Sequence, residues 1–131
     1  MKFFEILMVV LLIALNVAII ALIVSYVAER RHPTNYGKAH VLKTKGKHFN
    51  KVWNGFKQFE VRKGDREYHN NDIVVLKEIG GSIDGLTFYT GRKITARIEY
   101  VFDISDCFDG LVAFSIDVIK KETGIPRFEK D

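Results

Sequence analysis

The sequence predicts an α+β protein: a small β-barrel with one main helix packed on it, preceded by a single transmembrane α-helix. An uncharged apolar run near the start is long enough to cross a bilayer. After it come several short segments in which apolar and polar residues alternate, as in half-buried strands, and one segment with helical spacing. The roughly 95 residues beyond the membrane segment are enough for one compact domain.

The membrane segment extends from Ile6 to Ala28 and contains no charged residue, proline or glycine. As a helix it would measure about 34 Å, more than the ~30 Å hydrocarbon core of a bilayer. A cleavable signal peptide is the alternative, but its apolar stretch is only about 7–15 residues long. Tyr26 is also too large for the small-x-small cleavage pattern that would end at Ala28. We therefore expect contact with the lipid bilayer through residues 6–28.

Charged residues on the two sides of this segment predict its orientation. Arg30 and Arg31 follow it, with four lysines between positions 38 and 47, whereas only Lys2 and Glu5 precede it. The positive-inside rule places the more basic flank in the cytoplasm. The prediction is a single-pass membrane protein with its N-terminus outside and its C-terminal domain in the cytoplasm.

The composition limits the function classes. The formal net charge is +4, from 20 Lys and Arg against 16 Asp and Glu, which permits contact with nucleic acid or anionic lipid without requiring it. Cys107 is the only cysteine, so an intramolecular disulfide and a cysteine-based zinc site are excluded, and we expect Cys107 to be a packing residue. His40, His48 and His69 have no paired metal spacing, and no P-loop is present. We expect neither a metal nor a cofactor.

We divide the chain into four parts: residues 1–31 as transmembrane anchor and flanks, 32–38 as linker, 39–119 as the folded domain, and 120–131 as a charged C-terminal tail. Gly124 and Pro126 lie in the tail, which we expect to be frayed. The domain should contain, in order, a strand over 39–43, a helix over 45–54, a strand over 57–62, a loop over 63–71, a strand over 72–79, a turn over 80–85, and strands over 93–102 and 111–119.

Two of these elements have a clear sidedness. In the helix, Phe49, Val52 and Trp53 share one face, and Gly55 ends the helix. The strand over 57–62 alternates, with Phe59 and Val61 as its apolar face. Its polar face consists of Gln58, Glu60 and Arg62. We expect the apolar faces of both elements to meet in the core.

Several blocks between Ala39 and about Ile119 resemble a known family. They are His40-Val41-Leu42-Lys43, Gly55-Phe56-Lys57-Gln58-Phe59-Glu60-Val61-Arg62-Lys63-Gly64-Asp65-Arg66, Asp72-Ile73-Val74-Val75-Leu76, and Tyr89-Thr90-Gly91-Arg92. In this order they resemble the phage and bacterial ASCH-related domains of unknown function, in the PUA-like superfamily. The resemblance implies a PUA-like (ASCH-type) barrel whose cleft, near the helix and the strand after it, binds RNA or modified nucleotides. The sequence departs from the pattern at Gln58, Gly64, Asn71 and Ile79.

The matched blocks supply the candidate ligand-binding residues. They are His40, Lys43, Lys57, Glu60, Arg62, Lys63, Arg66, Tyr89, Thr90 and Arg92. The basic members suit phosphate oxygens, although a solvated basic rim would have the same composition. Tyr68, Tyr89 and Trp53 are aromatic residues that can stack on an unpaired base, and the helix face of Trp53 favours the core instead.

A catalytic alternative rests on Lys57 and Glu60. The domain is similar to an ASCH branch that hydrolyses an acylated cytidine with a Lys, a Thr and a Glu. Lys57 matches that Lys, but Glu60 occupies the Thr position, so the nucleophile is missing. A structural ion-pair network with Arg62, Asp65 and Arg66 is the simpler interpretation of Glu60.

We therefore expect a membrane-tethered binding module that recognises RNA or a nucleotide-like ligand in a basic cleft. A small hydrolase acting on a modified nucleoside and a membrane-associated protein-interaction domain are the alternatives. No particular protein partner is indicated by the sequence.

Overall fold

In the computed structural model, residues 2–29 and 36–130 are described, and the chain divides into two units, Met1–Thr34 and Asn35–Asp131. The first unit contains the helix α1 (Phe3–Glu29), in which no residue is buried. At about 1.5 Å per residue its 27 residues measure about 40 Å, so α1 is long and apolar enough to cross a membrane. Arg30, Arg31 and residues 32–35 of the predicted linker lie outside the described residues.

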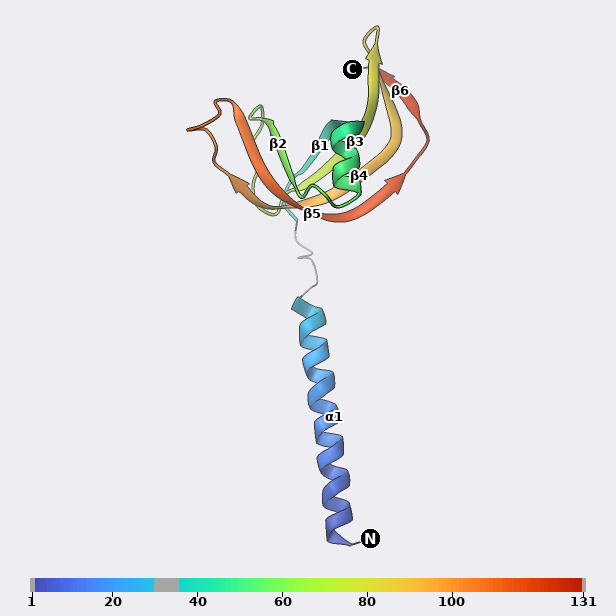
Figure 1. The fold of residues 1–131 in the computed structure, drawn as a ribbon, viewed down its shortest axis with the longest axis vertical. Coiled ribbons are helices and arrows are strands. Elements are labelled where there is room, and N and C mark those ends of the chain that lie inside the picture. The colour runs from blue at the N-terminus through green and yellow to red at the C-terminus, as the bar shows by residue number, and fades with distance from the viewer. Residues whose placement is uncertain (1, 30–35, 131) are drawn as a thin grey trace. The chain divides into compact units, whose positions relative to one another are not determined.

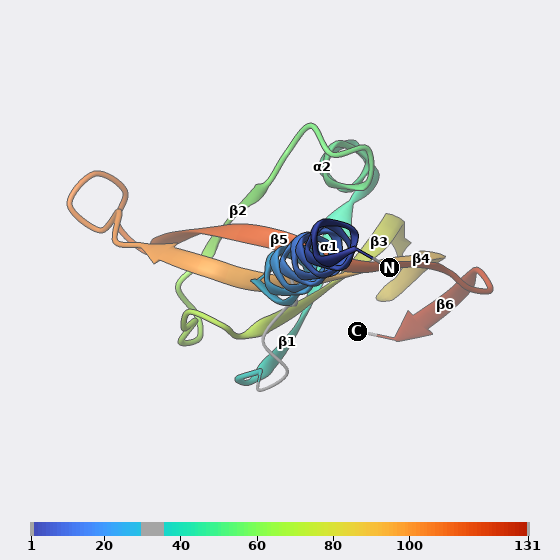
Figure 2. The ribbon, with the colours of Figure 1, turned by 90° about the horizontal axis from the view of Figure 1, so that it is seen from below.

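The second unit is an α+β domain with one six-stranded sheet and one helix. Its elements are β1 (Ala39–Lys45), α2 (Gly46–Trp53), β2 (Phe59–Lys63), β3 (Ile73–Ile83), β4 (Leu86–Phe102), β5 (Leu111–Thr123) and β6 (Arg127–Lys130). The strand order is β1-β3-β4-β5-β2, and β6 pairs with β4. Only the β1–β3 pair is parallel. The sheet curls into half a barrel, as Figures 1 and 2 show, so the predicted α+β class is confirmed.

The core lies between α2 and the concave side of the sheet. Phe49 and Val52 are almost fully buried against β1, β3, β4 and β5, as the helix pattern predicts, and Trp53 is half-buried at the margin of the core. Each buried side chain of this size stabilises the fold by about 1.5–3 kcal/mol. Gly55 has a φ of 80°, a left-handed conformation that ends the helix at the predicted residue.

The strand β2 alternates as predicted, but the predicted sidedness is wrong. Glu60 is 2% exposed and faces the interior, whereas Phe59 and Val61 are 52% and 46% exposed. β2 is an edge strand beside the polar side of α2, where Glu60 finds cationic partners. The alternation therefore identified the strand, but the polar face is the buried one because its charges are paired there.

The predicted turn over 80–85 is mostly strand. β3 continues to Ile83 and β4 begins at Leu86, so only Asp84 and Gly85 form the turn. Both residues have a positive φ, 50° and 76°, as expected for a two-residue hairpin whose twist matches the strands. The strand continues through Gly80 and Gly81 with a register shift between Ile79 and Gly81, so the glycines mark an irregularity within β3 and not its end.

The expectation of a frayed C-terminal tail is wrong. Residues 120–123 continue β5, and β6 pairs with the start of β4. The chain crosses from β5 to β6 where Gly124 N donates a hydrogen bond of 2.7 Å to Gly91 O. Gly91 has a φ of 92°, and a Cβ atom there would collide with the backbone of Gly124, so glycine is required.

Candidate functional site

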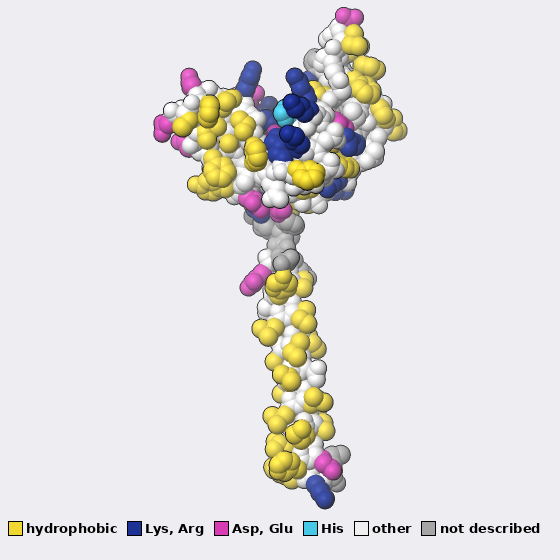
Figure 3. All heavy atoms as spheres, in the orientation of Figure 1, with side chains coloured by type: hydrophobic (Ala, Val, Ile, Leu, Met, Phe, Trp, Pro, Cys, Tyr) yellow, Lys and Arg dark blue, Asp and Glu magenta, His cyan; other side chains and the backbone are white. Residues whose placement is uncertain are grey.

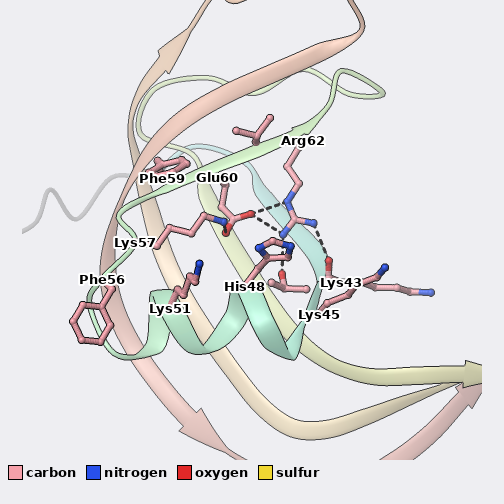
Figure 4. Close-up of a pocket in the computed structure, with 11 residues that line it drawn as sticks. Lys43, Lys45, His48, Lys51, Phe56, Lys57, Phe59, Glu60 and Arg62 are labelled. Atoms are coloured by element: carbon pink, nitrogen blue, oxygen red, sulfur yellow. Dashed lines mark hydrogen bonds and ion pairs between the residues drawn. The ribbon is translucent and has the colours of Figure 1, made fainter. Parts of the chain in front are cut away.

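The two edge strands of the half-barrel, β1 and β2, face each other across a seam that the Arg62 side chain bridges. Within residues 36–130 these strands do not pair with each other. The Arg62 guanidinium instead donates to Lys43 O at 2.8 Å and to Thr44 Oγ1 at 2.7 Å. Figure 4 shows Arg62 reaching from β2 towards the end of β1. Arg62 is therefore engaged in holding the two edges together.

Glu60 lies beneath the seam and orients two cations. Its Oε2 atom accepts from Arg62 Nε at 3.0 Å and Nη2 at 2.9 Å, and its Oε1 atom accepts from Lys57 Nζ at 3.1 Å. A buried carboxylate is tolerated only with such partners. The ion pair expected between Glu60 and Arg62 is present, whereas Asp65 and Arg66 form a separate, exposed pair. Glu60 thus sets the positions of Lys57 and Arg62.

A basic pocket opens above this network, bounded by the end of β1, one side of α2 and β2. Its volume is about 730 Å³, and its lining consists of Lys43, Thr44, Lys45, His48, Lys51, Phe56, Lys57, Phe59, Glu60, Val61 and Arg62. Figure 3 shows Lys and Arg side chains gathered around a hollow in this part of the domain. Five of the lining side chains are Lys or Arg, and one is acidic. The volume is in the range of small-molecule sites, roughly 300–1,000 Å³.

A second pocket of about 550 Å³ shares Lys43, Val61 and Arg62 with the basic pocket. It adds Lys63 and Arg66 to its lining. Tyr68 lines it but is only 8% exposed, because its ring packs between those of His40 and Phe114. Burial raises the pKa of Tyr68 above its usual value of 10.0, although Arg66 opposes the shift. Tyr68 therefore belongs to the core rather than to a stacking surface.

Thr90 and Arg92 are held elsewhere, by Glu78. The Glu78 carboxylate accepts from Thr90 Oγ1 at 2.5 Å and from Arg92 Nε and Nη2 at 2.8 and 2.7 Å. Burial would raise the pKa of Glu78, but these hydrogen bonds outweigh it and hold the pKa below 4.5. The Arg92 guanidinium also covers the rings of Phe49 and Trp53. It connects α2 to the sheet and does not line the basic pocket.

His40 and Tyr89 are also away from the basic pocket. His40 is 3% exposed, and its Nε2 atom lies 2.8 Å from Asp72 Oδ2. Asp72 also accepts the backbone N–H groups of Lys38 and His69 at 2.9 and 3.1 Å. Burial would raise the pKa of Asp72, but these hydrogen bonds hold it below 3.8. Tyr89 is 9% exposed and lines a smaller pocket of about 140 Å³.

Sequence reasoning missed several residues of the basic pocket. Lys45, His48 and Lys51 line it, and the spacing of three residues between His48 and Lys51 would have revealed a shared side of the helix. Phe56, 86% exposed, follows the helix-ending glycine, and its position had no periodic signal.

The predicted packing role of Cys107 is wrong, because this residue is exposed. Among residues 2–29 and 36–130, no three His, Cys, Asp or Glu are placed to hold a metal.

Residues 39–116, which include the whole basic pocket, match the family described as "Domain of unknown function (DUF3850)". The chain belongs to the DUF3850 family. Outside the DUF3850 segment lie α1, the end of β5 and β6.

The DUF3850 chain is also similar to the "Uncharacterized 12.9 kDa protein in GpA 3'region" of Escherichia phage P2. The two are 40% identical over 75 residues, which are 57% of this chain and 64% of the phage protein. The chain thus spans slightly less than two thirds of that relative. A phage relative agrees with the phage and bacterial distribution of the domains that the sequence resembles.

Proposed function

We propose that this protein is a membrane-tethered module that binds RNA or a nucleotide-like ligand in the basic pocket, and that its half-barrel is of the PUA-like, ASCH type. α1 would cross the bilayer with the N-terminus outside and the domain in the cytoplasm. The apolar composition of α1 and the excess of basic residues that follow it support this arrangement.

The pocket itself carries the proposal. Lys45 and Lys51 reach it from β1 and α2, and Lys57 from the loop that leads to β2. These three ammonium groups, beside that of Lys43, suit the oxygens of one or more phosphates. The exposed ring of Phe56 at its margin offers a face on which a base can stack. Since Arg62 is engaged at the seam, the lysines are the phosphate ligands in this proposal.

A hydrolase is the second candidate, favoured by the 3.1 Å contact between Lys57 Nζ and Glu60 Oε1 at the pocket wall. Two observations favour binding instead. Both oxygens of Glu60 are engaged by cations and its side chain is 3% exposed, so neither oxygen is free to accept a proton from a ligand. The position that carries Thr in the acylcytidine-hydrolysing branch carries Glu60 here.

The test uses the full-length chain in zwitterionic nanodiscs and a fluorescent single-stranded RNA of about ten nucleotides, titrated at 50 and 200 mM salt. With three phosphate contacts we expect affinity to fall about 20-fold across this range, since each contact on a single strand adds about −0.7 to the log–log slope. The Lys45→Ala/Lys51→Ala variant should lose about 1.4 of that slope. Lys38→Ala/Lys130→Ala removes the same charge from exposed positions outside the pocket and is the matched control.

Absence of binding at 50 mM salt, or equal losses in both double variants, would reject RNA recognition by this pocket. Incubation with an N4-acylated cytidine tests the hydrolase in parallel. Turnover that disappears in Lys57→Ala would favour the hydrolase over the binding module.

A further inference from the structure

One part of the sheet extends beyond the core as an arm, which we define as residues 79–83 of β3, 86–89 of β4 and 127–130 of β6. In its register, Phe88 lies opposite both Gly81 and Phe128, and Leu86 lies opposite both Ile83 and Lys130. Because paired residues and every second residue share a face, Ile83, Leu86, Phe88 and Phe128 lie on one face. The rings of Phe88 and Phe128 are 5.1 Å apart.

This apolar face is uncovered in the single chain. Ile83, Leu86 and Phe128 are 68%, 42% and 59% exposed. Figure 3 shows hydrophobic side chains following the arm at the upper right. Contiguous apolar surface of this kind marks an interaction site more often than isolated exposed residues do.

The arm also has an unpaired edge. β6 pairs with β4 along one side, as Figures 1 and 2 show, and no strand among residues 36–130 pairs with its other side. A flat edge beside an apolar face is a template for a strand of another chain. The backbone groups of β6 can therefore accept one more strand.

The sequence of β6 is complementary to itself. Arg127, Phe128 and Glu129 are consecutive, and Arg127 forms an ion pair with Glu129 along the strand. If two copies of β6 pair antiparallel about a two-fold axis at Phe128, Phe128 lies opposite Phe128. Arg127 then lies opposite Glu129 of the second copy, and this contact occurs twice. A register shifted by one residue places Arg127 opposite Lys130 or Phe128, so the charges favour the centred register.

We propose that the outer edge of β6, with the exposed ring of Phe128, forms a homodimer interface, and that the partner is a second copy of this chain. Cross-strand pairing joins the two arms into one continuous sheet. The same pairing places Phe88 and Phe128 of both copies in a row across the interface, so that the two Phe128 rings pack against each other on one side of the joined sheet. No residue of β6 lines the basic pocket, so this interface is independent of the proposed ligand site.

The first experiment measures self-association of the full-length chain in detergent micelles by sedimentation equilibrium. Arg127→Glu and Glu129→Arg each place like charges opposite each other at both contacts of a homodimer. Each variant should raise the dissociation constant by about tenfold or more. An equal mixture of the two variants should form heterodimers, because every contact then pairs Arg with Glu.

The mixture separates the interface from an effect within one chain. Each variant loses the ion pair between residues 127 and 129 of its own chain, and mixing the two variants does not bring that pair back. Association that returns in the mixture must therefore come from contacts between the two chains. The second experiment uses Phe128→Cys in a Cys107→Ser background, which should form a disulfide-linked dimer on mild oxidation, since directly opposed Cα atoms lie within disulfide reach. Lys130→Cys is the matched control, because its two copies would lie about 13 Å apart along the strands.

A wild-type chain that stays monomeric at about 100 µM would overturn the proposal, since a dimer with a dissociation constant of about 1 µM is almost fully formed at that concentration. A dimer unchanged by either charge variant would place the interface elsewhere. A mixture that does not associate, or equal cross-linking of Phe128→Cys and Lys130→Cys, would reject the centred β6 register.

Discussion

Glu60→Gln removes one charge from the domain interior while preserving the shape of the side chain. Lys57 and Arg62 then lose the counterion that lies 3.1 and 2.9 Å from them. Removal of one partner from a fully buried ion pair costs about 3–5 kcal/mol. Since the two cations retain 15% and 20% of their side-chain exposure, water compensates in part, and we expect a loss of roughly 2–3 kcal/mol. For a domain of this size the midpoint of thermal unfolding should fall by roughly 10–20 °C.

Trp53 provides the assay. It is the only tryptophan and lies half-buried against the core, so its fluorescence reports unfolding of the domain and not of α1. Glu67→Gln removes the same charge from an exposed position and should change stability by no more than about 0.5 kcal/mol. If Glu60→Gln unfolds within about 2 °C of the wild type, the buried network does not stabilise the domain as its geometry indicates.

Two further predictions concern the stability of the domain in acid and the crossing of Gly91 by Gly124 between β5 and β6. Because the pKa of Asp72 is lower in the folded domain than in the unfolded chain, its stabilisation is fully present above the unfolded value of 3.8 and is lost as pH falls through the folded pKa. Thermal unfolding measured between pH 6 and pH 2.5 should show this loss, and Asp72→Asn should flatten the profile. Gly91→Ala should destabilise the domain by about 2 kcal/mol or more, since its φ of 92° and the nearby Gly124 backbone exclude a Cβ atom. Hydrogen exchange in β6 should rise in this variant, and unchanged exchange would contradict the role of the crossing.

Much of the fold could be predicted from the period of the apolar residues. Phe49 and Val52 identified the buried face of α2, and alternation predicted the strand over 93–102, in which Ile94, Ala96 and Ile98 are buried. These signals are local, because each depends only on neighbours within one element. The α+β class and the apolar N-terminal helix follow from them directly.

The errors arise where a distant partner decides the outcome. Glu60 faces inward because β2 pairs with β5, where Glu60 lies opposite the buried Phe114, and nothing in the alternation of β2 reveals that its polar side is the inner one. The end of the chain is ordered because Gly124 crosses Gly91, a contact between residues 33 positions apart in the sequence. Such long-range contacts cannot be derived from local spacing.

The candidate site was predicted in part. Lys43, Lys57, Glu60 and Arg62 line one pocket, and Lys63 and Arg66 line its neighbour. The motif that contains Thr90 and Arg92 instead supplies the attachment of α2 to the sheet. A motif indicates that its residues share a role in the family, but it does not distinguish a binding role from a structural one.

The bridged seam has a consequence for dynamics. A barrel closed by a ladder of backbone hydrogen bonds opens only through local unfolding, which takes microseconds to seconds. Here the contact between the two edges through Arg62 consists of two side-chain hydrogen bonds, to Lys43 O and Thr44 Oγ1. Loss of both bonds requires a change of the Arg62 rotamer and release of its contacts to Glu60, but no break in a backbone ladder. The seam can therefore widen by the motion of one side chain, without local unfolding of either edge strand, while the core beneath it stays packed.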